Sequence, residues 1–313
     1  MGKKSNFTGL SRFVHQAFGD QETTTKKTDE SFQHPAKRRK VETGTVVAIH
    51  RGAEGLVPHY RSAEEVPEHL QKYFSQRKRY FSLYDQGCLL DEEGWYSVTP
   101  ERIADQIAER CRCDTVLDAF CGVGGNAIAF AKTCERVIAL DTSPVRLALA
   151  RHNAQIYGVA DRIEFILADY ISFAESYLSR ASGNGKRDID IVFLSPPWGG
   201  ISYLTNPQDS PDSDESDVSL VRHPEYSLAS VKPIHGADLF HLTRRITPNV
   251  AYFLPRHTSL DELSALLPSS DATSGGDDSQ QEILEIEEEW MGSKLKALTC
   301  YFGGLAAGQE HLF

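Results

Sequence analysis

The fold follows from the stretch Thr115-Val-Leu-Asp-Ala-Phe-Cys-Gly-Val-Gly-Gly-Asn126. An apolar run ends in Asp118, three glycines follow, and residues 127–132 have helix-forming composition, which is the order strand, tight turn, helix. A second apolar run, residues 137–140, ends in Asp141. Glycines let a ligand approach the backbone closely, and an acid at the end of the next strand suits the hydroxyls of a ribose. The stretch therefore predicts a nucleoside-containing cofactor held across the ends of two parallel strands.

Length and composition are those of a globular protein. The 313 residues are enough for one large domain or two small ones. No run approaches the roughly 20 apolar residues of a membrane span, and the N-terminus lacks the apolar core of a secretion signal. The six cysteines form no C-x-x-C pair, and the histidines show no metal-binding spacing. We therefore expect reduced thiols, a cytosolic or nuclear protein and no metal or membrane partner.

Charge is distributed unevenly along the chain. The formal net charge of -11 argues against a general nucleic-acid binder. Acidic residues concentrate in 209–217 and 277–289, whereas basic residues concentrate in 37–40 and 72–79. A local basic path for phosphates is compatible with an acidic whole.

The chain before residue 100 is predicted to have two parts. Residues 1–44 are polar and aperiodic, which indicates a disordered tail. Within it, Pro35-Ala-Lys-Arg-Arg-Lys40 resembles a nuclear localisation signal, although a solvated charge run is an equal alternative. Residues 45–99 are predicted to form a small N-terminal helical extension, with a helix over 61–82 and a turn-rich link at 91–100.

Strands and helices are predicted to alternate over residues 100–313. Thr99 is expected to cap the first helix, which has Pro100 at its first position. The expected strands are 116–119, 137–141, 163–167, 189–194, 250–254, 283–290 and 295–302, and the expected helices are 100–110, 125–133, 144–157 and 171–180. This α/β pattern predicts a seven-stranded, mostly parallel, Rossmann-like sheet with a terminal antiparallel hairpin. Polar inserts at 206–217 and 269–281 are expected to be flexible surface loops.

The acid before the glycine turn distinguishes between two cofactors. Gly122, Gly124 and Ala127 also satisfy the G-x-G-x-x-A pattern of NAD-binding proteins. Asp118 lies four residues before the first glycine, where a carboxylate would repel a pyrophosphate but attract the ammonium of a methionine moiety. S-adenosylmethionine has that ammonium and no phosphate. The sequence therefore favours S-adenosylmethionine over NAD, and hence the class I methyltransferase form of the fold.

Two further strand ends carry polar residues. The third strand is followed by Asp169, whose carboxylate can accept a hydrogen bond from an adenine amino group or simply cap the next helix. The fourth strand is followed by Ser195-Pro-Pro-Trp-Gly-Gly200. The two prolines make a stiff loop without backbone donors, and Trp198 offers a flat face on which a base can stack. A substrate is expected here, at the carboxyl end of a strand, although a rigid turn with a core tryptophan is the alternative.

These motifs together resemble the RNA cap guanine-N2 methyltransferase family, the trimethylguanosine synthases. A Ser/Asp/Asn-Pro-Pro-aromatic sequence after the fourth strand is typical of amino methyltransferases. The longer resemblance is carried by Lys72-Tyr-Phe-Ser-Gln-Arg77, Phe81, Glu93-Gly-Trp-Tyr-Ser-Val-Thr-Pro100, Asp118–Asn126, Ala150-Arg-His-Asn153 and Leu194–Gly200. It covers residues 60–313 and implies two successive methyl transfers from S-adenosylmethionine to guanine N2 of m7G caps on small nuclear and nucleolar RNAs.

The resemblance also implies roles for individual residues. Phe81, Ser97 and Thr99 would close over the cofactor, and it would be held by Asp118, Phe120, Gly122, Gly124, Asp141 and Asp169. The catalytic loop would be Ser195, Pro196, Pro197 and Trp198. Asn153 would contact the guanine beside Trp198, and Lys72 and Arg256 would meet the cap triphosphate. Because 7-methylguanine is cationic, stacking on Trp198 would gain about 1–2 kcal/mol of cation–π energy.

Several alternatives accompany this interpretation. Another amino methyltransferase acting on adenine N6 or a glutamine amide would share the loop but not the segment with Lys72 and Phe81. A non-catalytic cap-binding adaptor would keep the fold, but the intact acids and glycines argue against it. Cys121 could be a reactive thiol, although a small residue packed in the turn explains it better. The family and the basic run indicate a nuclear, or nucleolar, protein that meets small ribonucleoproteins.

Overall fold

A computed structural model describes most of the chain after residue 51. The described residues are 52–53, 55–181, 189–199, 225–268 and 282–306. Predictions for the basic run 35–40, Gly200 and the acidic inserts 206–217 and 269–281 lie outside them. The chain divides into two units, Met1–Thr45 and Val46–Phe313, and all that follows concerns the second. No described helix is long and apolar enough to cross a membrane.

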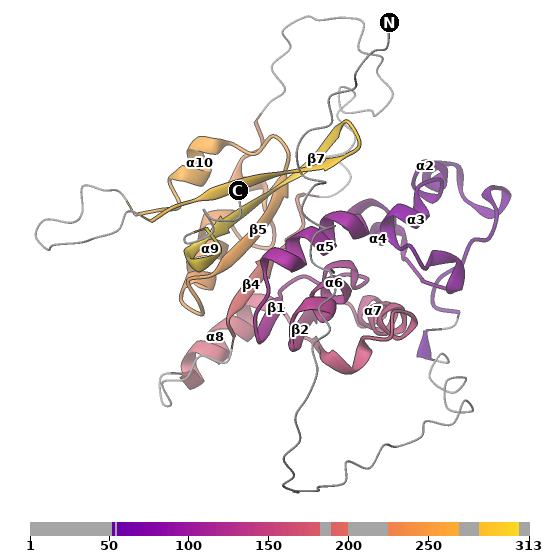
Figure 1. The fold of residues 1–313 in the computed structure, drawn as a ribbon, viewed down its shortest axis with the longest axis horizontal. Coiled ribbons are helices and arrows are strands. Elements are labelled where there is room, and N and C mark those ends of the chain that lie inside the picture. Colours follow the sequence, from indigo (N-terminus) through magenta and orange to yellow (C-terminus); the bar gives the residue numbers. More distant parts are fainter. Residues whose placement is uncertain (1–51, 54, 182–188, 200–224, 269–281, 307–313) are drawn as a thin grey trace, which may run out of the picture. The chain divides into compact units, whose positions relative to one another are not determined.

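A seven-stranded sheet organises this unit, with the strand order β3-β2-β1-β4-β5-β7-β6 (Figure 1). The strands are β1 (Thr115–Asp118), β2 (Arg136–Asp141), β3 (Ile163–Leu167), β4 (Ile191–Leu194), β5 (Val250–Pro255), β6 (Glu285–Met291) and β7 (Lys294–Phe302). Strands β1 to β5 run parallel, whereas β7 is antiparallel to both β5 and β6. The predicted Rossmann-like fold with a terminal hairpin is confirmed.

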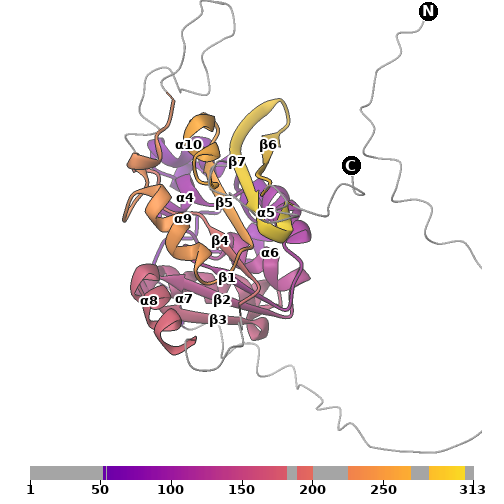
Figure 2. The same cartoon turned by 90° about the vertical axis from the view of Figure 1, so that its left-hand side faces the viewer.

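Helices cover both faces of the sheet. Successive residues of a strand point to opposite faces, so apolar side chains on each face pack against helices. On one face Val116 and Phe193 pack with α5 (Glu101–Arg110), α6 (Gly125–Thr133) and α7 (Pro144–Ile156). On the other face Leu117 and Val192 pack with α8 (Tyr170–Ala181), α9 (Gly236–Arg244) and α10 (Leu260–Ser264). Figure 2 shows α8 and α9 on one side of the strands and α5 and α6 on the other. Both β1 and β4 are buried on both faces, and β4 is apolar throughout, whereas β1 begins with Thr115 and ends in Asp118.

The N-terminal extension is a series of short helical turns rather than the single helix predicted over residues 61–82. The turns are η2 (Ala63–Glu65), η3 (Glu68–Leu70), α2 (Gln71–Phe74), α3 (Arg77–Tyr80), η4 (Tyr84–Gln86) and α4 (Glu92–Ser97). They wrap an aromatic cluster in which Trp95 lies 5.6 Å from Tyr84 and 6.2 Å from Phe74, between ring centroids. Tyr84 and Trp95 follow the end of the predicted helix, so the cluster packs Phe74 against a different segment of the extension, and such tertiary burial can override a local helical pattern.

Other local predictions need correction. The link predicted at 91–100 contains α4, whose N-terminus is capped by the Asp91 carboxylate accepting from Gly94 N–H at 2.9 Å. Pro100, not Thr99, is the N-cap of α5. Helices α9 and α10 and the short turns η5 (Ala160–Arg162), η7 (Leu228–Ser230) and η9 (Gly303–Leu305) were not predicted.

Candidate active site

The candidate site lies where the strand order reverses. The chain runs from β1 to β2 and β3 on one side, then returns to β4 and β5 on the other side of β1. In open α/β sheets a ligand binds outside the carboxyl ends of the strands at such a point. Here Asp118 ends β1, Asp141 ends β2 and Ser195 follows β4. The topology thus brings together residues that the sequence separates widely.

Asp118 is a fully buried carboxylate at this edge. Neither of its oxygens has a hydrogen-bond partner of good geometry among the described residues. Burial raises the pKa of Asp118 to about 7, and nearby Asp141 adds to the shift, while the backbone amides of Phe120 and Ala127 oppose it. A buried, unpaired carboxylate is costly unless a cation meets it. Its surroundings fit the ammonium of a methionine moiety.

The glycine turn brings bare backbone to the same place. Gly122 and Gly124 have φ values of 51° and 91°, a conformation that residues with a Cβ rarely adopt. A Cβ at Gly124 would lie 3.0 Å from the Cβ of Ala150 on α7. Asp141 closes the turn from the other side, because its carboxylate accepts from the N–H of Gly122 at 3.1 Å and of Ser143 at 2.7 Å. Burial is the largest cause of the raised pKa of Asp141.

The extension packs directly on this turn. Gly94 of α4 faces Val123, since a Cβ at Gly94 would be 3.0 Å from a Val123 methyl. The Thr99 hydroxyl accepts from Asn126 Nδ2 at 3.0 Å. Two predicted cofactor residues thereby have distinct positions: Thr99 contacts the turn, whereas Ser97 is exposed and donates to the carbonyl of Glu93.

The remaining predicted cofactor residues also have other contacts. Phe81 is 2% exposed and lies 6.1 Å from the ring of Tyr157. Phe120 packs 5.7 Å from Tyr170. Asp169 caps α8 by accepting from Ser172 N–H at 2.9 Å. Their roles in cofactor binding stay predictions.

The proline loop after β4 presents Trp198 at the boundary between the two cores. The Trp198 ring is partly exposed, packs against both hydrophobic clusters and lies 5.6 Å from Phe253 at an interplanar angle of 32°. The Ser195 hydroxyl donates to the carbonyl of Phe120 at 3.4 Å, and the carbonyl of Pro197 accepts from Lys232 N–H at 3.0 Å. The indole therefore packs between the two cores and keeps part of its surface exposed.

The matched family is the RNA cap guanine-N2 methyltransferase family, whose model covers residues 113–305. The chain belongs to this family. A trimethylguanosine synthase from Schizosaccharomyces pombe is 39% identical over 211 residues, spanning 64% of this chain and 76% of the relative. A trimethylguanosine synthase from Saccharomyces cerevisiae is 36% identical over 202 residues, spanning 62% of this chain and 57% of the relative. The predicted family is therefore confirmed.

S-adenosylmethionine is the methyl donor of this cap methyltransferase, and the observed residues fit it. The unpaired Asp118 carboxylate suits its ammonium, and a Cβ at Gly122 would meet nothing within 4 Å, so there is open space beside that glycine. Asp141 uses one lone pair on each oxygen, which leaves capacity for ribose hydroxyls. Among the described residues no group of three or more His, Cys, Asp or Glu side chains could hold a metal ion. Cys121 is buried in the turn, and burial raises its thiol pKa, which agrees with packing rather than reactivity.

Asn153 of the cap methyltransferase is placed differently from the prediction. Its side chain has no exposed surface, so it cannot touch guanine in this structure. Its Oδ1 accepts from Leu89 N–H at 2.8 Å, and its Nδ2 donates to the carbonyls of Leu89 and Val123 at 2.9 Å each. Asn153 thus ties the extension to the glycine turn.

Arg146 also connects α7 to the extension, and the sequence did not predict this contact. From the first turn of α7 its guanidinium pairs with Asp91 at 2.9 Å and with Glu93. Arg146 and Asn153 are seven residues apart, which places them on one face of α7. Neither contact had a sequence signal beyond the charge of Arg146.

Replacing Asn153 by alanine is expected to destabilise the enzyme by roughly 3 kcal/mol, because three buried backbone groups lose their partners. The check is urea unfolding of the full chain. Gln155→Ala removes a half-buried amide from the same helix, two residues away, and should unfold like the parent. An Asn153→Ala protein as stable as Gln155→Ala would contradict this account.

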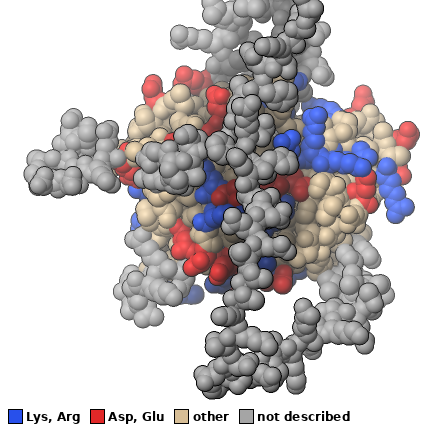
Figure 3. Space-filling model, in the orientation of Figure 1, with Lys and Arg blue, Asp and Glu red and all other residues tan. Residues whose placement is uncertain are grey.

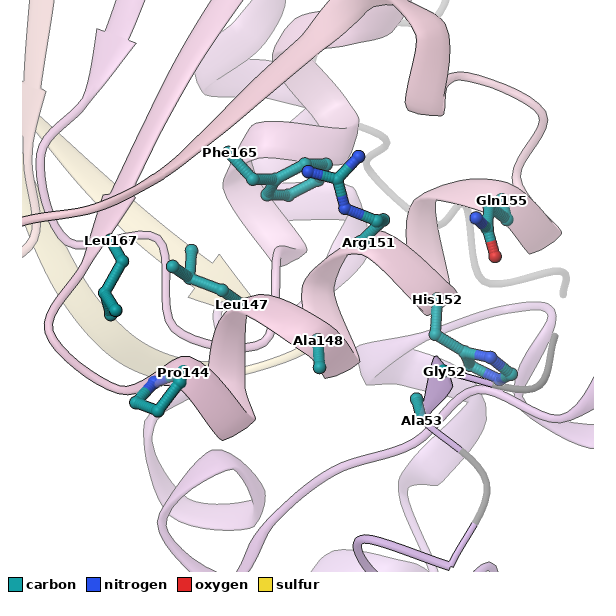
Figure 4. Close-up of a pocket in the computed structure, with 10 residues that line it drawn as sticks. All are labelled: Gly52, Ala53, Pro144, Leu147, Ala148, Arg151, His152, Gln155, Phe165 and Leu167. Carbon is teal, nitrogen blue, oxygen red and sulfur yellow. The ribbon is translucent and has the colours of Figure 1, made fainter. Parts of the chain in front are cut away.

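A cavity of about 300 Å³ lies away from these residues, between α7 and β3 (Figure 4). Its labelled wall includes Leu147 and Arg151 from the helix and Phe165 and Leu167 from the strand, with the Arg151 guanidinium 5.0 Å from the Phe165 ring centre. None of the predicted site residues lines it. We assign this cavity no part in methyl transfer.

Proposed function

We propose that this methyltransferase converts the m7G cap of small nuclear and nucleolar RNAs to 2,2,7-trimethylguanosine by two successive transfers to guanine N2. One observation carries the proposal: the partly exposed indole of Trp198 lies on the loop after β4, beside the strand that ends in Asp118. The family model and the two trimethylguanosine synthases give independent support.

The residues of this chain would position the reactants rather than supply a strong base. S-adenosylmethionine supplies an electrophilic methyl group when bound. Trp198 would stack on the cationic 7-methylguanine, which favours it over guanine by about 1–2 kcal/mol. The carbonyls of Ser195 and Pro196 would accept from the N2 amino group and so orient its lone pair toward the methyl carbon. As the new N–C bond forms, the bond between the methyl carbon and sulfur would break with its electron pair staying on sulfur, and the N2 proton would leave to water.

Lys72 and Arg256 are proposed to hold the cap triphosphate. Both are exposed, and Arg256 directly follows β5, the neighbour of β4 in the sheet. The Lys72 ammonium lies 5.0 Å from the ring centre of Tyr73. Two exposed cations suit a phosphate bridge that stays solvated.

The direct test supplies the full-length protein with methyl-labelled S-adenosylmethionine and either m7GpppA or GpppA. We expect label on N2 of the first dinucleotide, first as one and then as two methyl groups, and at least tenfold less on the second. Equal rates on both would remove the cation–π basis of the proposal. Tight cap binding without any transfer would instead indicate an adaptor, and transfer to adenine N6 another amino methyltransferase.

A nuclear site of action is also proposed, where capped small RNAs and their ribonucleoprotein particles would be met. The support is the basic run 37–40 together with the family. A reporter fused to residues 1–44 should accumulate in nuclei, and Lys37-Arg38-Arg39-Lys40 replaced by glutamines should abolish this. A fusion that stays in the cytosol would contradict the signal.

A further inference from the structure

Basic side chains from separate segments lie near Arg256, which is proposed to bind the cap triphosphate. Pro255 at the end of β5 pairs with Ala297 on β7. One further step of this antiparallel register brings Arg256 to the level of Lys296. Lys294 lies two residues before Lys296, and residues two apart in a strand share a side. The hairpin therefore carries a pair of cations next to one already proposed to meet phosphate.

Arg79 of α3 joins this group from the extension. Burial is the largest cause of the lowered pKa of Lys296, and the charges of Lys294, Arg256 and Arg79 add to it in that order. Figure 3 shows Lys and Arg gathered on the side between the β6–β7 hairpin and α3. Neither Arg79 nor Lys296 forms a salt bridge within the part of the chain that the structure describes. Arg79 and Lys296 thus add two positive charges beside Arg256, and positive charges grouped in this way attract an anion.

We propose that Lys296 and Arg79 bind the backbone phosphates of the first transcribed nucleotides, as the RNA chain leaves the cap pocket past Arg256. This inference rests on the proposed function and extends it from the cap to the RNA that carries the cap. A flexible single strand needs point charges along its path rather than a fixed register, which two long, adjustable side chains can provide. Continuity with the triphosphate position favours RNA over an acidic protein.

The test compares the m7GpppA dinucleotide with an m7G-capped RNA of ten nucleotides. The wild-type enzyme should show a higher kcat/KM on the RNA, and the excess should fall with salt. In the double variant Lys296→Gln/Arg79→Gln, kcat/KM on the RNA should drop about tenfold more than on the dinucleotide. The slope of log KM against log salt for the RNA should become shallower by about 1.4, or 0.7 for each phosphate that the variant no longer neutralises.

The matched control is Arg112→Gln/Arg136→Gln. It removes the same charge from exposed ion pairs near the amino ends of β1 and β2, the opposite edge of the sheet. It should behave like the wild type on both substrates. Equal losses of the test variant on dinucleotide and RNA, or a wild type indifferent to RNA length, would overturn the inference. So would competition by polyglutamate as strong as that by uncapped RNA, which would indicate an acidic protein partner. No methyl transfer to either substrate would instead be a failure of the proposed function.

Discussion

Replacing Trp198 by alanine is expected to lower kcat/KM for m7GpppA by about 100- to 1,000-fold. Stacking of a base on an aromatic ring contributes roughly 1–3 kcal/mol, and the cationic 7-methylguanine adds about 1–2 kcal/mol of cation–π energy. Trp198 is the aromatic residue on the proline loop at the carboxyl end of β4, and its ring lies 5.6 Å from the Phe253 ring. The measurement is steady-state kinetics with varied cap at saturating S-adenosylmethionine.

Two comparisons separate stacking from damage to the fold. Trp290 of β6 is 51% exposed, so Trp290→Ala removes the same side chain far from β4 and should leave kcat/KM unchanged. Trp198→Leu fills part of the volume without a π face, so its preference for m7GpppA over GpppA should fall toward unity. Full activity in Trp198→Ala, or an undiminished preference in Trp198→Leu, would rule out the platform.

The inner strands β1, β4 and β5 were predictable because they are buried on both faces and form largely apolar runs between turn residues. The ends of all seven strands were placed within two residues. Helix α6 was predicted at its observed bounds, since Gly124 with positive φ marks its start. The acids at the ends of β1 and β2 were located in the same way, as the residues that end two apolar runs. These features are local, so sequence spacing is enough to locate them.

Features that depend on distant contacts were not predictable. Asn153 is bonded to Leu89 and Arg146 to Asp91, so neither side chain's role is encoded near its own position. The aromatic contact of Phe74 with Trp95 likewise joins the predicted helical segment to a residue far along the chain. A polar residue beside a family motif suggests that its side chain contacts the ligand. If that side chain is buried in the fold, however, it forms its hydrogen bonds with backbone groups instead.

Asp118→Asn is expected to weaken binding of S-adenosylhomocysteine about 100-fold at pH 8 and to abolish the pH dependence of that binding. The product keeps the ammonium of the methyl donor but not its sulfonium, so it isolates the pair with Asp118. With a pKa of about 7, Asp118 is largely protonated at pH 6 in the ligand-free enzyme. Affinity should therefore rise about tenfold per pH unit up to pH 7 and then level off, as the carboxylate becomes available. Titration calorimetry below pH 7 should detect a proton released on binding.

The same carboxylate makes the stability of the ligand-free protein fall with pH, whereas it makes the affinity for the ligand rise with pH. The pKa of Asp118 is raised on folding, from about 3.8 to about 7, so between these pH values the folded state holds a proton that the unfolded state has lost. The free energy of unfolding should fall as pH rises through this window, by an amount on the order of a few kcal/mol, and Asp118→Asn should remove that part of the fall. Asp105→Asn is the matched control, because it removes a carboxylate of α5 that pairs with Lys132 and leaves Asp118 to titrate. If Asp118→Asn bound S-adenosylhomocysteine as tightly as the wild type does, the ammonium would have to lie elsewhere. No ligand would then pair with the buried carboxylate of Asp118.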